Sequence, residues 1–171
     1  VAFLQYTGGT TGVSKGATLL NRNIIANMLQ VEAWMQPAIN THTDEQHNFV
    51  CALPLYHIFA LTVCNMIGMR TGSCNLLIPN PRDIPGFVKE IGKYPFTTIT
   101  GVNTLFNAMI NNPDFANIDL SKLHLTLGGG MAVQRAVAER WLEVTKTPLV
   151  EAYGLTETSP GACINPLVKG A

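Results

Sequence analysis

Charged residues are scarce in this chain of 171 residues: Asp, Glu, Lys and Arg make up 13% of it, and 11 basic residues balance 11 acidic ones. Apolar residues make up 47%, so the chain can bury enough surface to fold and is not a disordered segment. A formal charge of zero provides no broad basic surface, so nucleic acid is not expected as a partner. Any phosphate binding must therefore come from a local site.

Long apolar runs and paired cysteines are also lacking. Residues 48–69 contain no Asp, Glu, Lys or Arg, but Pro54 and His57 interrupt them, so we expect a buried strand, a turn and a core helix instead of a membrane span. The four cysteines form no C-x-x-C pair, and most lie in apolar runs: Cys51, Cys64, Cys74 and Cys163. They are expected to be reduced core thiols of a cytosolic protein, not a disulfide or zinc framework.

Internal repeats, low-complexity tracts and linkers rich in Pro, Gly or Ser are absent as well. The length fits one domain or part of a larger one. Because the chain opens without an initiator Met, we expect residues 1–171 to be a segment of a longer polypeptide.

Residues 1–48 are expected to form a hairpin and a helix. Leu4–Thr7 has the composition of a strand, 8–16 that of a Gly/Thr loop, and 17–20 that of a returning strand. A helix is predicted over about Arg22–Met35, with Asn21 or Asn23 as its cap.

Residues 49–171 alternate between short apolar, often β-branched runs and segments with helical spacing. Ile84, Phe87, Val88 and Ile91 predict a helix over 84–91, with Asp83 as N-cap and Gly92 ending it in the left-handed conformation. A second amphipathic pattern covers 133–144. Strands are expected at Phe49–Leu53, Asn75–Ile78, Phe96–Thr100, Leu123–Leu127 and Leu149–Tyr153. This alternation predicts an α/β fold with a mostly parallel sheet flanked by helices.

The most informative stretch for chemistry is Tyr6–Gly16, YTGGTTGVSKG, which contains four glycines, three threonines and one lysine. Glycines let backbone N–H groups turn toward an anion, threonine hydroxyls donate to phosphate oxygens, and lysine adds a positive charge. The pattern predicts a phosphate-binding loop, although it departs from G-x-x-x-x-G-K-[ST]. A plain Gly/Thr hairpin tip remains the alternative.

A second stretch, Glu151–Ser159, follows a predicted strand, where ligands gather in open α/β sheets. Tyr153 offers a stacking face, Thr156 a hydroxyl group, and Glu157 a carboxylate suited to Mg²⁺. A polar turn that satisfies its own backbone is the alternative.

Two further stretches follow predicted strands. Gly128–Gly130 suggests that something flat lies against the main chain, and a tight turn between strand and helix is its alternative. Leu53–His57 places an imidazole beside a strand end, where a core or surface histidine is the plainer interpretation.

Together these four stretches resemble the adenylate-forming superfamily of acyl-CoA synthetases, luciferases and peptide-synthetase adenylation domains. Tyr6–Gly16 is similar to its phosphate-loop signature and Tyr153–Thr158 to its Y-G-x-T-E motif. Their order and separation match, and the resemblance covers essentially the whole chain. Within the superfamily, 8–17 followed by Asn21-Arg22-Asn23 looks most like bacterial long-chain fatty acid–CoA ligases, so the chain is expected to be part of the large N-terminal, AMP-binding domain.

The resemblance implies a two-step reaction. A fatty acid carboxylate attacks the α-phosphate of ATP to give acyl-AMP and pyrophosphate, and the thiol of CoA then displaces AMP. It implies that Thr7 and Glu157 help coordinate Mg²⁺, that Thr156 contacts the α-phosphate, and that His57 lies near the acyl carboxylate, with 55–66 lining the acyl tunnel. Tyr153 would stack on adenine, which Gly128, Gly129 and Gly130 would sandwich from the other side, and Gly154 would also belong to the nucleotide-binding residues. The β- and γ-phosphates would be held by Thr7, Gly8, Gly9, Thr10, Thr11, Gly12 and Lys15.

Two departures from the family pattern matter. Ser14 stands where many members have proline, which implies a more mobile loop. The family's ribose-binding aspartate, hinge and C-terminal lysine would all follow residue 171, so the 171 residues alone are expected to lack activity.

Other interpretations remain open. The chain could belong to an adenylation domain that loads a carrier protein, or to a non-catalytic nucleotide-binding module. For the parent enzyme the resemblance implies a cytoplasmic location, and it leaves open peripheral contact with the inner membrane and a homodimer.

Overall fold

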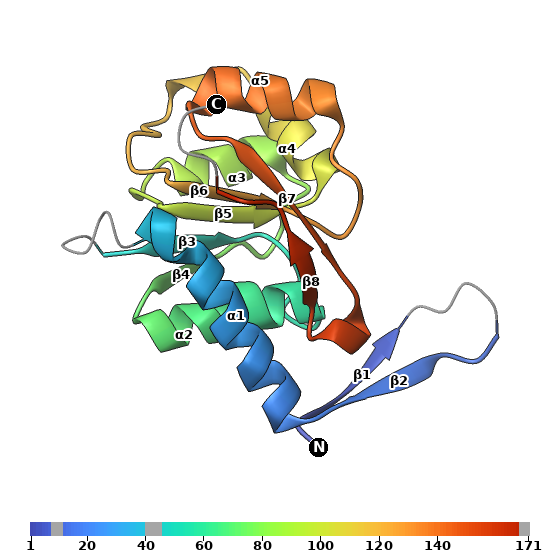
Figure 1. The fold of residues 1–171 in the computed structure, drawn as a ribbon. Helices are drawn as coiled ribbons and strands as arrows, with labels where there is room; N and C mark the ends of the chain where they lie inside the picture. The colour runs from blue at the N-terminus through green and yellow to red at the C-terminus, as the bar shows by residue number, and fades with distance from the viewer. Residues whose placement is uncertain (8–11, 40–45, 168–171) are drawn as a thin grey trace.

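The computed structural model describes residues 1–7, 12–39 and 46–167 and contains a central sheet of six strands in the order β4-β3-β5-β6-β7-β8 (Figure 1). Neighbouring strands pair in parallel, except β7 and β8, which are antiparallel. The strands are β3 (Asn48–Cys51), β4 (Cys74–Leu77), β5 (Thr98–Gly101), β6 (Leu125–Gly128), β7 (Leu149–Gly154) and β8 (Gly161–Ile164). The mostly parallel α/β fold is confirmed, and the antiparallel edge strand β8 was not predicted.

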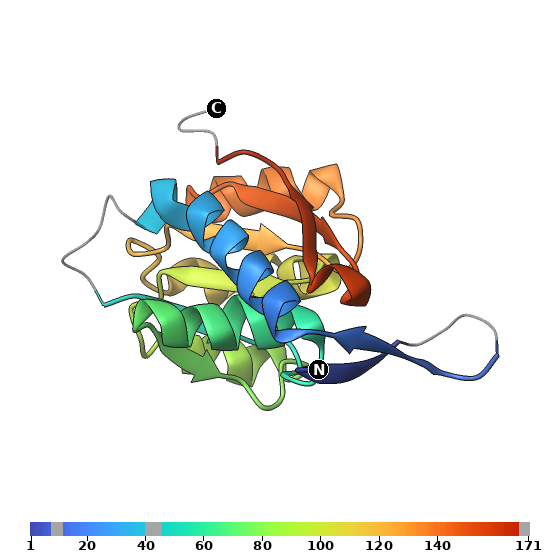
Figure 2. The same cartoon turned by 60° about the horizontal axis from the view of Figure 1, so that its bottom comes forward.

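Helices cover both faces of this sheet (Figures 1 and 2). One face carries α3 (Ile84–Ile91), α4 (Asn103–Ile110) and α5 (Arg135–Thr145). The other carries α1 (Asn21–Ile39), the π-helix η2 (Ala60–Met66) and α2 (Ile67–Thr71). Short 3-10 turns lie at η3 (Phe115–Asn117) and η4 (Thr156–Thr158).

The largest apolar core lies under α3, α4 and α5. Trp141 is completely buried there, with its indole edge against the ring of Phe106 at a centroid distance of 4.8 Å. Phe87, Ile91 and Met109 are also buried in this cluster. The amphipathic patterns predicted over 84–91 and 133–144 thus face the sheet, as their spacing requires.

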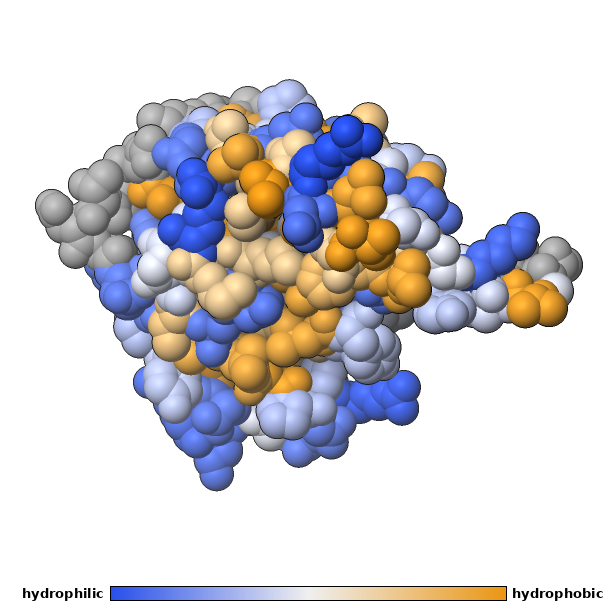
Figure 3. Space-filling view, turned by 90° about the horizontal axis from the view of Figure 1, so that it is seen from below, coloured by the Kyte–Doolittle hydropathy of each residue, from blue (hydrophilic) through white to orange (hydrophobic). Residues whose placement is uncertain are grey.

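The N-terminal hairpin lies apart from this sheet. It consists of β1 (Phe3–Thr7) and β2 (Lys15–Leu19), paired antiparallel from Phe3 opposite Leu19 to Thr7 opposite Lys15. Figures 1 and 3 show it projecting from the body of the molecule. Leu19 anchors its base because it is buried with Ile24 and Ile58.

The predicted ends of two helices needed correction. Asp83 caps α3 as expected, accepting a hydrogen bond from the backbone N–H of Gly86 at 3.1 Å. Gly92, however, is right-handed (φ −65°), since the chain continues into a turn closed by the N–H of Lys93. A side chain at Gly92 would lie 2.9 Å from Ile118, so close packing explains the glycine.

Helix α1 is longer than predicted and has Pro37 near its end. Asn23 caps it from inside the first turn, because its amide oxygen accepts a hydrogen bond from the N–H of Leu20 at 3.0 Å. Within the described ranges, no helix is long and apolar enough to cross a membrane, and 48–69 forms the expected strand, turn and core helix.

The cysteines divide into two pairs. Cys51 and Cys64 are buried beside each other, and their hydrogen bond together with burial raises the pKa of the Cys64 thiol. Cys74 and Cys163 are exposed, so the prediction of core thiols was wrong for them. Both lie on outer strands of the sheet, β4 and β8, where alternate side chains point away from the core.

Candidate functional site

A cavity of about 510 Å³ lies where the strands β6 and β7 end. Parallel strands place their carboxyl ends at one edge of the sheet, which is the common place for ligand binding in such folds. The cavity walls come from β1, the segment 56–63, the two strand ends, β8 and Val31 of α1. Segments distant in the sequence therefore meet around one space.

Most of the predicted site residues that the structure describes line this cavity. They are Thr7, His57, Gly129, Gly130, Tyr153, Gly154, Thr156 and Glu157. Gly128, the last residue of β6, is buried and is not part of the lining. Lys15 and Gly12 are exposed on the hairpin and are not part of the lining, and Gly8, Gly9, Thr10 and Thr11 lie outside the described residues.

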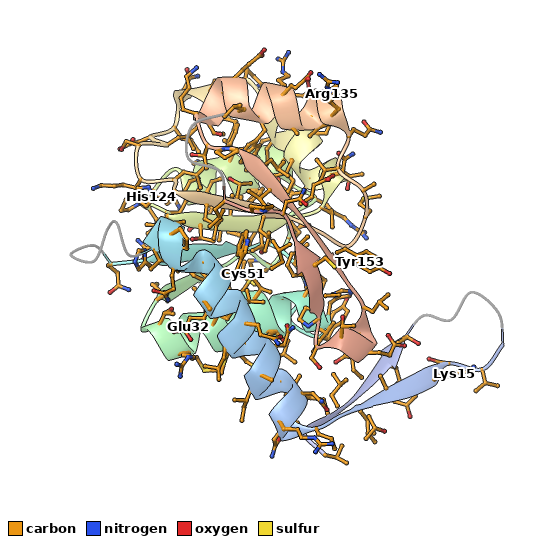
Figure 4. The ribbon with its side chains drawn as sticks, in the orientation of Figure 1. Lys15, Glu32, Cys51, His124, Arg135 and Tyr153 are labelled. Atoms are coloured by element: carbon orange, nitrogen blue, oxygen red, sulfur yellow. The ribbon has the colours of Figure 1, made fainter. Side chains whose placement is uncertain are left out.

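The glycine-rich turn and the Tyr153–Glu157 stretch both follow strands, as the sequence predicts, and they lie at one edge of the sheet because Gly128 and Glu151 are directly paired in adjacent parallel strands. Tyr153, near the end of β7, is 62% exposed and lines the cavity. Figure 4 shows Tyr153 and Lys15 on the same side of the molecule, with Lys15 far out on β2. The sequence also predicts that Tyr6–Gly16 is poorly ordered without nucleotide, and residues 8–11 of this stretch lie outside the described residues.

Protein packing accounts for part of the glycine-rich turn. A side chain at Gly128 would lie 2.8 Å from both Leu149 and Val133, and one at Gly129 would lie 3.2 Å from the ring of Phe59. Gly130 has a left-handed conformation, with φ +77°. The two interpretations of Gly128–Gly130, a tight turn between strand and helix and a surface for a flat ligand, are therefore compatible. Gly129 and Gly130 belong to the packed turn and also line the cavity.

The turn η4, which carries Thr156 and Glu157, is held by a local network. The N–H of Leu155 donates to the carbonyl of Pro160 at 3.1 Å and lies 2.9 Å from the hydroxyl oxygen of Thr158. The Thr158 hydroxyl also donates to the carbonyl of Pro160. Thr158 is therefore a structural residue, whereas Glu157 is exposed at the cavity.

His57 is oriented by its own backbone. Its Nδ1 atom accepts a hydrogen bond from the N–H of Phe59 at 3.2 Å. In the neutral imidazole the proton must then be on Nε2, which becomes a donor. The neighbouring carbonyl of Tyr56 accepts a hydrogen bond from Gln5 at 2.6 Å, so strand β1 is tied to this wall of the cavity.

The hairpin is closed by side-chain bonds as well as strand pairing. The hydroxyl of Ser14 donates to the carbonyl of Thr7 at 3.1 Å, and the hydroxyl of Thr7 donates to the carbonyl of Lys15 at 3.4 Å. A proline at position 14 could not make the first of these bonds. Lys15 extends from β2 into solvent.

Sequence reasoning missed several residues of the cavity wall. Gly161 and Ile164 come from β8, whose four residues are too short to give a clear alternating pattern. Phe59, by contrast, lies in the segment 55–66 that the resemblance had pointed to.

The chain belongs to the AMP-binding enzyme family, whose model matches residues 1–170. It is 58% identical over 166 residues to a long-chain-fatty-acid–CoA ligase of Escherichia coli O6:H1, and the match covers 97% of this chain and 29% of that protein. The corresponding ligase of Haemophilus influenzae is 53% identical over 171 residues, which cover 99% of this chain and 30% of that protein. The chain thus spans about three tenths of the length of these curated relatives.

The fold comparison agrees with this assignment. A crystal structure of the anthranilate CoA ligase AuaEII in complex with anthranoyl-AMP superposes with a TM-score of 0.81. The identity is 24%, and the match covers 96% of this chain and 31% of that one. At this identity the similarity shows the fold alone, a mostly parallel α/β sheet flanked by helices.

Proposed function

We propose that this chain is part of the large N-terminal domain of an ATP-dependent long-chain fatty acid–CoA ligase. The observation that carries the proposal is the meeting of three family motifs around one cavity: Thr7 of the phosphate loop, Gly129–Gly130, and Tyr153–Glu157. The 58% identity to the Escherichia coli ligase supports the substrate class. As the relatives are about three times longer, the complete reaction is assigned to the parent protein and not to residues 1–171 alone.

Formation of acyl-AMP requires the negative charge of the triphosphate to be neutralised and its atoms to be positioned. In this proposal Lys15 and the loop 7–12 hold the β- and γ-phosphates, and Thr156 donates to the α-phosphate. Tyr153 stacks on adenine, and the backbone of Gly129–Gly130 lies against its other face. The exposed ring of Tyr153 at the cavity supports this arrangement.

The oxygen atoms of Thr7 and Glu157 suit Mg²⁺, because both side chains line the same cavity and Mg²⁺ commonly takes only one or two protein oxygens beside phosphates and water. Elsewhere in the chain as described, no cluster of three His, Cys, Asp or Glu side chains offers another metal site. When bound there, Mg²⁺ would reduce the charge repulsion between ATP and the incoming carboxylate. Glu157 and Thr7 would hold the ion on the phosphate side.

The fatty acid is expected to enter from the apolar side of the cavity. Phe59, Val63 and Leu127 are buried in one cluster and reach this wall, and Val31 and Ile164 extend it. His57 stands at the polar end of this wall, where its Nε2–H can donate to a carboxylate. The His57 imidazole thereby orients the nucleophilic carboxylate. It does not act as a general base, since a carboxylate needs no deprotonation.

The test uses the complete protein with palmitate, ATP and Mg²⁺. Pyrophosphate release that depends on palmitate, followed by thioester formation when CoA is added, is the expected result. Adenylation without transfer to CoA would instead favour loading of a carrier protein. Nucleotide binding without pyrophosphate release would favour a non-catalytic module, and the 171-residue segment should show no turnover.

We expect the reaction to take place in the cytoplasm, where ATP and CoA are available. Sedimentation of the complete protein with anionic lipid vesicles tests contact with the inner membrane, and light scattering tests a homodimer.

A further inference from the structure

Asn27 is a buried polar residue in the middle of helix α1, with only 5% of its surface exposed. Its amide nitrogen donates to the carbonyl of Gly161 at 2.6 Å, and its amide oxygen accepts from the N–H of Gly161 at 3.0 Å. A buried amide is costly unless its polar atoms are paired. Here one side chain satisfies both backbone groups of a single residue, as a neighbouring strand would do.

Gly161 connects this pair to the turn that carries Glu157. It is the first residue of β8 and directly follows Pro160. The carbonyl of Pro160 accepts the bonds from Leu155 and Thr158 that close η4. Movement of Gly161 away from α1 would therefore move the turn with Thr156 and Glu157.

On its other side, the Asn27–Gly161 pair is connected to the N-terminal hairpin of β1 and β2, which carries Thr7 and Lys15. Helix α1 begins at Asn21, with a single residue between it and β2, and the base of the hairpin is packed against the same helix through Leu19 and Ile24. Strand β2 also contacts η4 directly. Asn27 is thus a hydrogen-bonded link between the helix that carries the hairpin and the strand that carries the Glu157 turn (Figure 1).

We propose that Asn27 is a positioning residue for Mg²⁺-ATP: it fixes the distance between Glu157 on η4 and Thr7 on the hairpin, the two side chains that the proposed function assigns to the same Mg²⁺ ion. This inference rests on the proposed function. Asn27 does not line the cavity, so it acts through Gly161 and not by touching the nucleotide. A displacement of about 1 Å at such a site can reduce the rate about a hundredfold.

The same helix provides a matched control. Trp34 lies further along α1, and its indole N–H donates to the carbonyl of Asn165, just after β8, at 2.9 Å. Both side chains therefore attach α1 to the chain around β8, but only Asn27 does so next to η4. Trp34→Phe removes one such bond and leaves the turn unaffected.

The experiment compares the complete protein with its Asn27→Ala and Trp34→Phe variants. Binding of Mg²⁺-ATP is measured by calorimetric titration, and two half-reactions are followed: pyrophosphate release with palmitate, and transfer of the acyl group from palmitoyl-AMP to CoA. For Asn27→Ala we expect binding of Mg²⁺-ATP and pyrophosphate release to weaken about tenfold or more, with a much smaller change in acyl transfer. Trp34→Phe should keep the wild-type dependence on Mg²⁺-ATP.

Two outcomes overturn the inference: an Asn27→Ala variant with wild-type affinity for Mg²⁺-ATP, or a Trp34→Phe variant that loses as much affinity as Asn27→Ala. If the alanine variant does not fold, Asn27→Asp retains the side-chain volume and the bond from the Gly161 N–H, and it should show the same selective loss. Wild-type protein that binds Mg²⁺-ATP but releases no pyrophosphate with palmitate would reject the proposed function alone, because the titration still tests Asn27.

Discussion

The two faces of the sheet are built differently. Under α3, α4 and α5 the buried side chains form one continuous cluster that includes Trp141, Phe106 and Phe87. On the side of α1, α2 and η2 the buried residues are divided among smaller clusters, and the cavity opens between them. One face thus provides most of the apolar stabilisation, and the other leaves room for a ligand.

The two faces of the sheet also differ in whether their buried polar atoms have hydrogen-bond partners. On the first face, the indole N–H of Trp141 donates to the hydroxyl of Thr126 at 3.2 Å. The buried side-chain oxygens without a partner in the described part of the chain belong to Thr62 in η2, Asn75 beside α2, and Ser159 beside η4. A buried oxygen that stays unpaired costs about 1–3 kcal/mol, and these three lie on the side of the sheet that holds the cavity.

The largest expected effect tests the continuous core. Trp141→Ala in the complete protein should reduce the free energy of unfolding by about 3–5 kcal/mol, because it removes a fully buried ring and leaves a cavity. Urea denaturation measures the change. Where the variant remains folded, its affinity for Mg²⁺-ATP should equal that of the wild type. A selective loss of nucleotide binding would contradict the assignment of stability to one face and ligand binding to the other.

A comparably large effect is expected for substitutions around the cavity and the hairpin, but on the reaction rate and not on the free energy of unfolding. Lys15→Ala and Glu157→Ala should each slow acyl-adenylate formation by roughly 10²–10³-fold, about 2.7–4 kcal/mol of barrier, because each removes a charge that the proposed function assigns to pyrophosphate or Mg²⁺. Pyrophosphate release is measured beside a thioester assay started from palmitoyl-AMP, which should change much less. Equal slowing of both half-reactions by Lys15→Ala would assign Lys15 a structural role. Both side chains are exposed, so unfolding free energies should stay near wild type.

His57→Ala should have a smaller and different effect. The half-saturating concentration of palmitate should rise, while that of ATP changes little, because in the proposed function Nε2–H donates to the acyl carboxylate and not to the phosphates. Steady-state kinetics with each substrate varied in turn measures this. His57→Gln can still donate a hydrogen bond and should recover part of the loss; if it does not, the donor role is wrong.

The smallest effect is expected at the surface of the first face. Asp83→Ala removes the side chain that caps α3 and should lower the free energy of unfolding by about 1 kcal/mol, without altering either half-reaction. Asp83→Asn keeps a capping oxygen and serves as the control in the same urea titration. A change in adenylation rate for the alanine variant would show that the two faces are coupled.

Much of the fold could be predicted from the sequence because its signals are local. The spacing of Ile84, Phe87, Val88 and Ile91 determined which side of α3 faces the sheet, and Asp83 determined where the helix begins. The strands of the parallel sheet were located to within a few residues, since alternation of strands and helices leaves few topologies. The motifs likewise marked the residues that meet at the cavity.

Other features depend on residues that are distant along the chain, and the sequence does not show their contacts. The exposure of Cys74 and Cys163 depends on which strands lie at the outside of the sheet, and the need for a glycine at position 92 depends on the approach of Ile118. The link between Asn27 and Gly161 joins residues 134 positions apart and has no local signature. Local sequence therefore determined the elements and their chemical groups, whereas the cavity and the alignment of its walls were decided by packing, because burial and hydrogen bonding depend on all the elements that meet at one place.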